Sequence, residues 1–206
     1  MNKILFTSLI IGFFLGACND AKNERKIQNS IAENYSNPPK IKTFTNVEDL
    51  INILSDKSSL SFNEWRKSKF IDGSEKWSSN TAIEQFGKRS NNGFQNDIGY
   101  VIYGKEKKYC NEVQIVLNIK NKSEFDEALF SLSVWSEQTL DKLKIEVPEN
   151  LNQAILDGQQ FAYENESAYI LLHKQNKSEE NYNIHPEITL DNRVNYQSWK
   201  LIVKSK

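Results

Sequence analysis

The feature that most constrains the fold is a strand pattern followed directly by a long helix pattern. Residues 112–120 alternate apolar and polar side chains, which is typical of a strand with one buried and one mostly wet face. An apolar stripe at helical spacing then runs through about five turns, formed by Phe125, Ala128, Leu129, Leu132, Trp135, Leu140 and Leu143. The pair predicts an amphipathic helix lying on a sheet.

Other segments carry shorter signals of the same two kinds. A second helix is predicted from near Pro148 to Gly158, a common residue at helix ends. Strands are predicted at residues 98–103, 161–163, 168–174 and 199–203, with a brief one at 188–190. This order predicts an α+β fold, an antiparallel sheet of about five strands with two helices packed on one face.

Residues 45–92 precede this part of the chain and carry three capping-box patterns. The boxes pair Thr45 with Glu48, Ser61 with Glu64, and Thr81 with Glu84. Each box lies next to apolar residues, which is a signature of a helix N-terminus. We therefore expect a small region of short helices over 45–92 and the sheet with its helices over 93–206, together forming a single domain over 45–206.

The N-terminus has the pattern of a secretory signal. Lys3 precedes an apolar run over residues 4–15, which is shorter than the roughly 20 residues that a membrane span needs. The residues that close the run, Leu15, Gly16, Ala17 and Cys18, resemble the lipobox of bacterial lipoproteins, in which a dedicated peptidase cuts before the cysteine. The alternatives are an ordinary secretory signal with a coincidental cysteine, and an N-terminal core helix.

The resemblance implies that residues 1–17 are a removable signal peptide and that Cys18 is lipidated and holds the chain on a membrane. Acyl chains contribute about 0.8 kcal/mol per buried CH₂, and stable anchoring takes more than one chain. Residues 19–44 are polar and without periodicity, so residues 18–44 are expected to form a lipidated, flexible tether. By resemblance to lipoprotein sorting, Asn19 favours the outer membrane, facing the periplasm.

Charge and cysteine content narrow the function further. Without residues 1–17 the chain has 25 Lys and Arg against 27 Asp and Glu, which gives no electrostatic footprint for nucleic acid. Cys18 and Cys110 are the two cysteines. With Cys18 acylated, Cys110 lacks an intramolecular partner and is expected to be a small buried apolar residue in a strand.

The sequence contains none of the common nucleotide, metal or nucleophile motifs that we searched for. We expect no metal and no cofactor, and catalytic residues are unknown. The two histidines, His173 and His185, are not at metal-ligand spacing, although either could be the general base of an envelope hydrolase if the fold brought it to a nucleophile and an acid.

Aromatic residues in the segment 62–77 offer a binding alternative. Trp65, Phe70 and Trp77 stand among polar residues, and exposed rings could form the floor of a sugar or peptide site. Packing of the same rings against the sheet is the competing interpretation, which we favour.

Taken together, these patterns favour a lipid-anchored, non-enzymatic envelope protein that binds a protein partner. An immunity or inhibitor role fits this context by analogy. An envelope hydrolase or a sugar-binding or peptidoglycan-binding module is the alternative.

Overall fold

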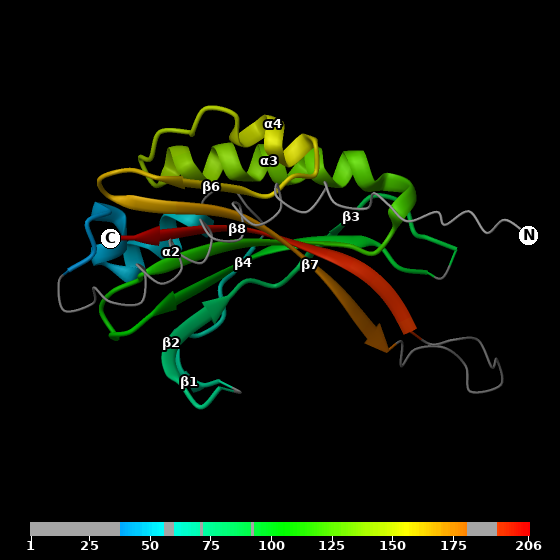
Figure 1. Cartoon of the computed structure of the whole chain (residues 1–206). Coiled ribbons are helices and arrows are strands. Elements are labelled where there is room, and N and C mark those ends of the chain that lie inside the picture. The colour runs from blue at the N-terminus through cyan, green and yellow to red at the C-terminus, as the bar shows by residue number, and fades with distance from the viewer. Residues whose placement is uncertain (1–37, 56–59, 71, 92, 181–192) are drawn as a thin grey trace, which may run out of the picture. The chain divides into compact units, whose positions relative to one another are not determined.

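The computed structural model describes residues 38–55, 60–70, 72–91, 93–180 and 193–206. In this part of the chain, eight strands form one antiparallel sheet that carries helices, so the predicted α+β class is confirmed. Across the sheet the strands follow the order β1-β2-β4-β5-β8-β7-β6, and β3 pairs with β4 (Figure 1).

The elements have the following bounds. The strands are β1 (Arg66–Lys69), β2 (Glu75–Asn80), β3 (Glu84–Phe86), β4 (Asn96–Gly104), β5 (Glu112–Ile119), β6 (Phe161–Glu164), β7 (Ala168–Glu180) and β8 (Arg193–Ser205). The helices are α2 (Val47–Ser55), α3 (Phe125–Lys142) and α4 (Leu151–Leu156), with the 3₁₀ turns η1 (Lys42–Thr45) and η2 (Lys122–Glu124).

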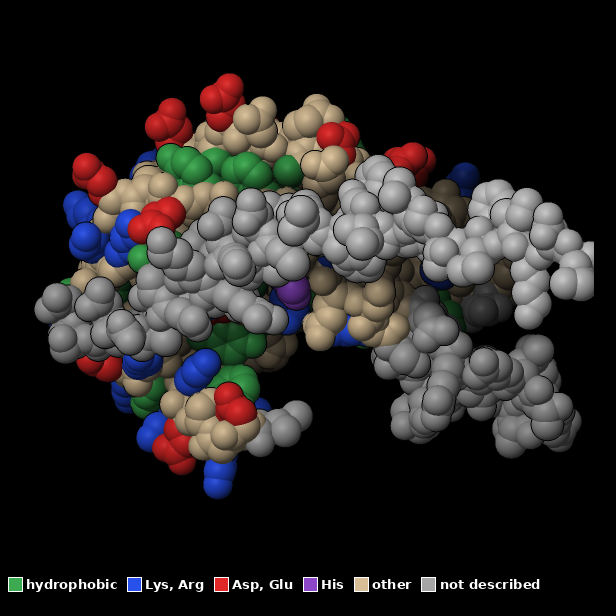
Figure 2. Space-filling model, viewed as in Figure 1, with side chains coloured by type: hydrophobic (Ala, Val, Ile, Leu, Met, Phe, Trp, Pro, Cys, Tyr) green, Lys and Arg blue, Asp and Glu red, His purple; other side chains and the backbone are tan. Residues whose placement is uncertain are grey.

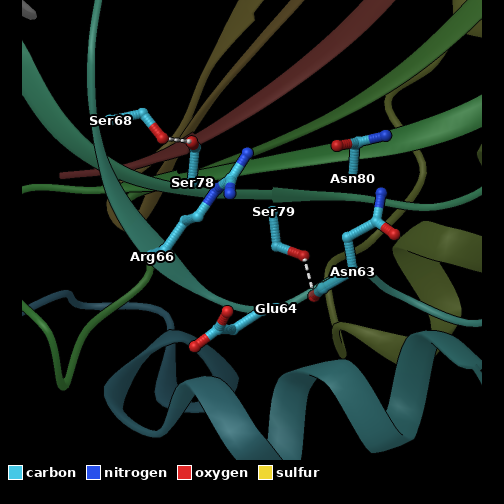
Figure 3. Close-up of a pocket in the computed structure, with 7 residues that line it drawn as sticks. All are labelled: Asn63, Glu64, Arg66, Ser68, Ser78, Ser79 and Asn80. Atoms are coloured by element: carbon cyan, nitrogen blue, oxygen red, sulfur yellow. Dashed lines mark hydrogen bonds between the residues drawn. The ribbon is translucent and has the colours of Figure 1, made fainter.

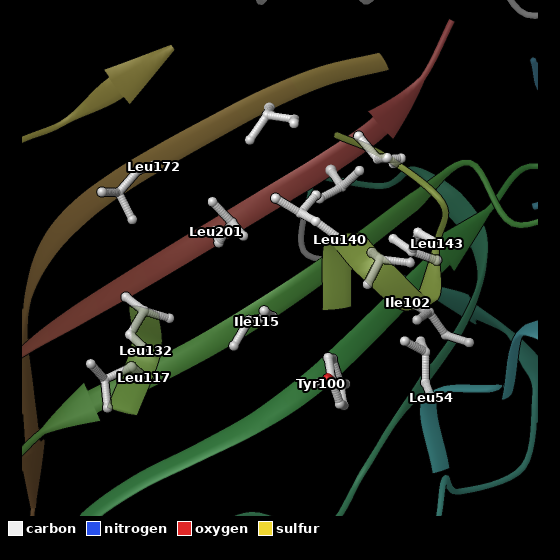
Figure 4. Close-up of a cluster of buried hydrophobic side chains, with 14 of the residues drawn as sticks. Leu54, Tyr100, Ile102, Ile115, Leu117, Leu132, Leu140, Leu143, Leu172 and Leu201 are labelled. Carbon is white, nitrogen blue, oxygen red and sulfur yellow. The ribbon is translucent and has the colours of Figure 1, made fainter. Parts of the chain in front are cut away.

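The core lies between the sheet and the helices α3 and α4, which cover one of its faces (Figure 1). The predicted stripe of α3 faces this core, and its residues Leu132 and Leu140 are fully buried. They lie over apolar residues of the central strands such as Ile115 and Leu201 (Figure 4). Burying a leucine side chain stabilises a fold by about 1.5–3 kcal/mol. Packing of this apolar stripe therefore holds the helix on the sheet.

The sheet is larger than the expected five strands. The predicted strands at 98–103, 112–120, 161–163, 168–174 and 199–203 are all present, but β7 and β8 are each 13 residues long and pair with each other along their whole length. The brief strand expected at 188–190 lies outside the described residues.

Three strands also stand where short helices were expected. The first capping box does precede the helix α2, but the boxes at Ser61 and Thr81 begin no helix. Thr81 instead bonds to the central strand, where its backbone N–H donates to Tyr100 O at 3.0 Å and its Oγ1 accepts from Tyr100 N at 3.0 Å. The expectation of short helices over 60–92 is therefore wrong, because this short four-residue pattern also occurs where its threonine caps no helix and bonds to a strand.

The last residues of the expected tether belong to the folded body. Ile41 and Phe44 are buried, and the backbone carbonyl of Phe44 accepts a hydrogen bond from Cys110 N at 3.0 Å. The body therefore includes residues from Pro38 onward, so the tether does not extend to residue 44. Residues 18–37 lie outside the described part of the chain.

Candidate functional site

A pocket of about 550 Å³ lies beside the hairpin of β1 and β2. All of its lining residues have polar or charged side chains: Asn63, Glu64, Arg66, Ser68, Ser78, Ser79 and Asn80 (Figure 3). An opening of this size and polarity fits a polar ligand or an inserted segment of another chain.

Arg66, Ser68, Ser78 and Asn80 line the pocket from the side of the sheet that faces away from α3, whereas Ser79, opposite Ile102, has its side chain on the other face. Arg66 pairs with Ser78, and Ser78 pairs with Tyr103 of β4. Directly paired residues of antiparallel strands have side chains on the same face, and successive residues alternate between faces. Because Ile102 belongs to the core under α3, its neighbour Tyr103 and the side chains of Arg66 and Ser78 lie on the other face.

Hydrogen bonds hold the neutral side chains of the pocket in place. Ser79 Oγ donates to Asn63 O at 2.5 Å, and Ser78 Oγ donates to Ser68 Oγ at 3.4 Å. Asn80 Nδ2 donates to Thr81 O at 3.0 Å. The neutral rim is thus preorganised by the hairpin itself.

The two charged residues of the pocket, unlike the neutral ones, have no described hydrogen-bond partner. Arg66 and Glu64 are both exposed, and no hydrogen bond or ion pair joins either side chain to another described residue. In Figure 3 the Arg66 side chain extends toward Ser78, while Ser79 points away from it toward Asn63 and the Glu64 carboxylate lies apart. The guanidinium therefore has its five N–H donors available to a ligand.

The three aromatic residues predicted as binding candidates divide between the two faces of this hairpin. Trp65 and Trp77 stack on each other with ring centroids 6.2 Å apart, and Trp65 Nε1 donates to Lys107 O at 2.8 Å. Trp65 also packs against the core. Phe70 packs on Tyr103, on the face of the pocket, at 5.8 Å. All three rings are half-buried, and Trp65 and Trp77 hold the hairpin on the rest of the sheet.

A buried polar cluster lies further along the same face. Asp97 accepts from Asn118 Nδ2 at 2.6 Å, and its other oxygen lies 3.2 Å from Lys120 Nζ. Asp97 is 1% exposed, so this carboxylate is already held by an amide and an ammonium group. The cluster links β4 to β5 and to Lys120 just beyond it.

His173 does not meet the requirements of a hydrolase base in the described part of the chain. It is half-buried on β7, directly opposite Lys200 of β8. Burial lowers the pKa of Lys200, with a further contribution from Lys177. No hydrogen bond joins His173 to Ser198, which lies two residues from Lys200 on β8, or to Asp97. His185 lies outside the described residues.

Cys110 is buried and free, as expected, but it lies between β4 and β5 and not in a strand. Burial raises the pKa of its thiol to about 12. The described residues contain no cluster of His, Cys, Asp and Glu that could hold a metal ion.

The lipobox residues Leu15, Gly16, Ala17 and Cys18 lie outside the described residues. None of the described helices is both long and apolar enough to cross a bilayer.

Sequence reasoning missed Arg66, although one signal could have found its hairpin. Asp72 and Gly73 form a turn dipeptide between the two strands, and Gly73 has the positive φ of 81° that such turns favour. Asp72 Oδ1 accepts from both the N–H and the hydroxyl of Ser74, at 2.9 and 2.7 Å. The flanking strands are short and charged, so alternation of apolar residues could not reveal them.

Comparisons with protein-family models, with curated proteins and with solved structures found no match to this chain.

Proposed function

We propose that this chain is a lipid-anchored, non-enzymatic protein of a bacterial envelope that binds a protein partner. The observation that carries the proposal is the preorganised polar pocket in which Arg66 and Glu64 have no partner among the described residues. The resemblance of residues 15–18 to a lipobox supports the anchor. Membrane confinement through Cys18 raises the local concentration of such a domain near an envelope partner.

An immunity or inhibitor role is the specific form that we propose. A small domain held on the outer membrane and facing the periplasm would meet an incoming protein before it reached its target. Such a role requires a binding surface, which the polar pocket with its exposed Arg66 and Glu64 would supply.

Site-specific photo-crosslinking in living cells tests this proposal. A photoreactive amino acid replaces Asn80 at the rim of the pocket, and a matched variant carries it at Phe130, which is 61% exposed on α3. We expect one protein adduct at position 80 that position 130 does not give. No adduct at position 80, or equal adducts at both positions, would count against a partner at the pocket.

A sugar-binding module is the second candidate, favoured by the uniformly polar lining of the pocket and the half-buried ring of Phe70 on the same face. Calorimetric titration with soluble peptidoglycan fragments separates the two. Saturable heat that Asn80→Ala removes would favour this candidate over the protein partner.

A further inference from the structure

The pocket also indicates the chemistry of what it binds. The guanidinium of Arg66 is planar, always charged and forked, which matches a carboxylate through two parallel hydrogen bonds. The side chains of Ser68, Ser78 and Asn80 stand around it and can add neutral polar contacts. Because Arg66 has no carboxylate partner among the described residues, a ligand can supply one.

The charge around the pocket favours an acidic ligand. Residues 64–78 and 104–109, which form the hairpin and the neighbouring turn, carry seven basic and four acidic side chains. The helical layer has the opposite balance, with seven acidic and two basic side chains in residues 125–158. In Figure 2 acidic side chains appear along the helical layer, while near β1 and β2 both basic and acidic side chains are visible. An acidic partner is therefore attracted to the pocket end and repelled from the helices.

The position of β1 in the sheet is a second reason to expect an acidic ligand, and it indicates an extended one. Among the described strands, β1 is last in the sheet order, so one of its edges has no described partner. An edge strand can accept an extended segment through main-chain hydrogen bonds. Its sequence, Arg-Lys-Ser-Lys, repels a second copy of itself, and a segment added at this edge would meet Arg66 on the pocket face of the strand.

We propose that β1 and the Arg66 pocket bind an acidic, extended segment of the partner protein, with one carboxylate of that segment on the Arg66 guanidinium. This inference rests on the proposed function and names the partner chemistry. Glu64 limits the site, because its carboxylate lies in the same pocket and repels a second anion.

The test uses the mature, anchored chain in neutral detergent micelles and a dye-labelled peptide of alternating glutamate and threonine. Fluorescence anisotropy measures its dissociation constant. We expect Arg66→Ala to weaken binding roughly tenfold or more, as the loss of a charged hydrogen-bonded pair would. Glu64→Gln should tighten it, and the matched peptide of glutamine and threonine should bind weakly to every variant.

Lys67→Ala is the matched control. Lys67 is the next residue on the same strand, points to the opposite face and already pairs with Glu75 at 2.6 Å. We expect less than about a twofold change for this variant, since an exposed ion pair contributes little. Equal losses for Lys67→Ala and Arg66→Ala would reduce the binding to general charge attraction and overturn the inference.

Two further results separate this inference from the proposed function. If the crosslinked adduct at position 80 persists in Arg66→Ala at wild-type yield, a partner binds but not through a carboxylate on Arg66. If vesicles of phosphatidylglycerol bind in an Arg66-dependent way and the acidic peptide does not, the pocket holds a lipid phosphate, and the acidic-segment inference fails.

Discussion

Cys110 is a residue whose chemistry is decided by its surroundings. Its Sγ lies 3.4 and 3.2 Å from the carbonyl oxygens of Tyr103 and Glu112, so its one S–H can donate to either of them, and desolvation is the main cause of its raised pKa. A thiol with a pKa of about 12 is almost wholly protonated at neutral pH, and the thiolate is the nucleophile.

We therefore expect Cys110 in the folded chain to resist iodoacetamide and to react only as the chain unfolds. Peptide mass spectrometry before and after addition of denaturant measures the labelled fraction. Fast labelling of the native protein at pH 7 would contradict this burial.

Tyr100 and Thr139 form a buried polar contact between β4 and α3, with their hydroxyl oxygens 2.7 Å apart. Thr139→Val leaves the Tyr100 hydroxyl without this partner, which costs about 1–3 kcal/mol of unfolding free energy. Thr139→Ser, which keeps the hydroxyl, should cost less. Chemical denaturation of both variants gives the comparison, and equal losses would mean that the hydrogen bond contributes nothing measurable.

The same tyrosine is expected to make the folded state less stable at alkaline pH. Burial raises the pKa of Tyr100 above its ordinary value, and the hydrogen bond to Thr139 opposes this only in part. Above a pH of about 10 the unfolded state loses a proton that the folded state retains, so the free energy of unfolding falls as pH rises. We expect Tyr100→Phe to reduce this fall between about pH 9 and pH 11. Tyr103 and Cys110, whose pKa values burial also raises, would contribute the rest of the fall.

At the scale of elements, the helix α3 offers a test of core against surface. Leu132 is fully buried over the sheet, whereas Phe130 is 61% exposed on the same helix. Leu132→Ala should lower the free energy of unfolding by about 2–5 kcal/mol through lost burial and a cavity. Phe130→Ala should change it by less than about 0.5 kcal/mol. Comparable effects of the two substitutions would place the core elsewhere.

How far the sequence predicts each element depends on how much apolar surface that element buries. The helix α3 and the strands β4 and β5 have a buried face, which leaves a periodic pattern. The strand β1 has the sequence Arg-Lys-Ser-Lys and no buried residue, so its place in the sheet comes from pairing with β2 and from Trp65 beside it. The Arg66 pocket depends on that hairpin and could not be predicted from periodicity.

The capping-box spacing gave a wrong prediction at one position, because the same residues can also occur beside a strand. Thr81 and Glu84 fit a capping box, but the hydroxyl of Thr81 bonds to Tyr100 and Glu84 pairs with Ile98. Both contacts are with a strand more than ten residues away in sequence, which no local pattern records. Two of the predicted aromatic candidates lie close to the pocket in the chain. Trp77 belongs to β2, and Phe70 directly follows β1.

At the scale of the whole molecule, the proposed function combines an anchor at one end of the chain with a pocket on the folded body. The anchor is predicted from residues 1–18 alone, and the body contributes no described helix that could replace it. If the anchor is removed by Cys18→Ala, we expect the protein to leave the membrane fraction while Arg66-dependent peptide binding is unchanged. Loss of peptide binding as well would mean that the pocket depends on the anchor.

The most direct measurement is intact-mass and N-terminal peptide spectrometry of the protein purified from membranes. We predict a chain that starts at Cys18 and carries the added mass of several fatty acyl groups on that residue. A chain that retains residues 1–17, or that starts elsewhere with an unmodified Cys18, would contradict the lipid anchor and the envelope role that depends on it.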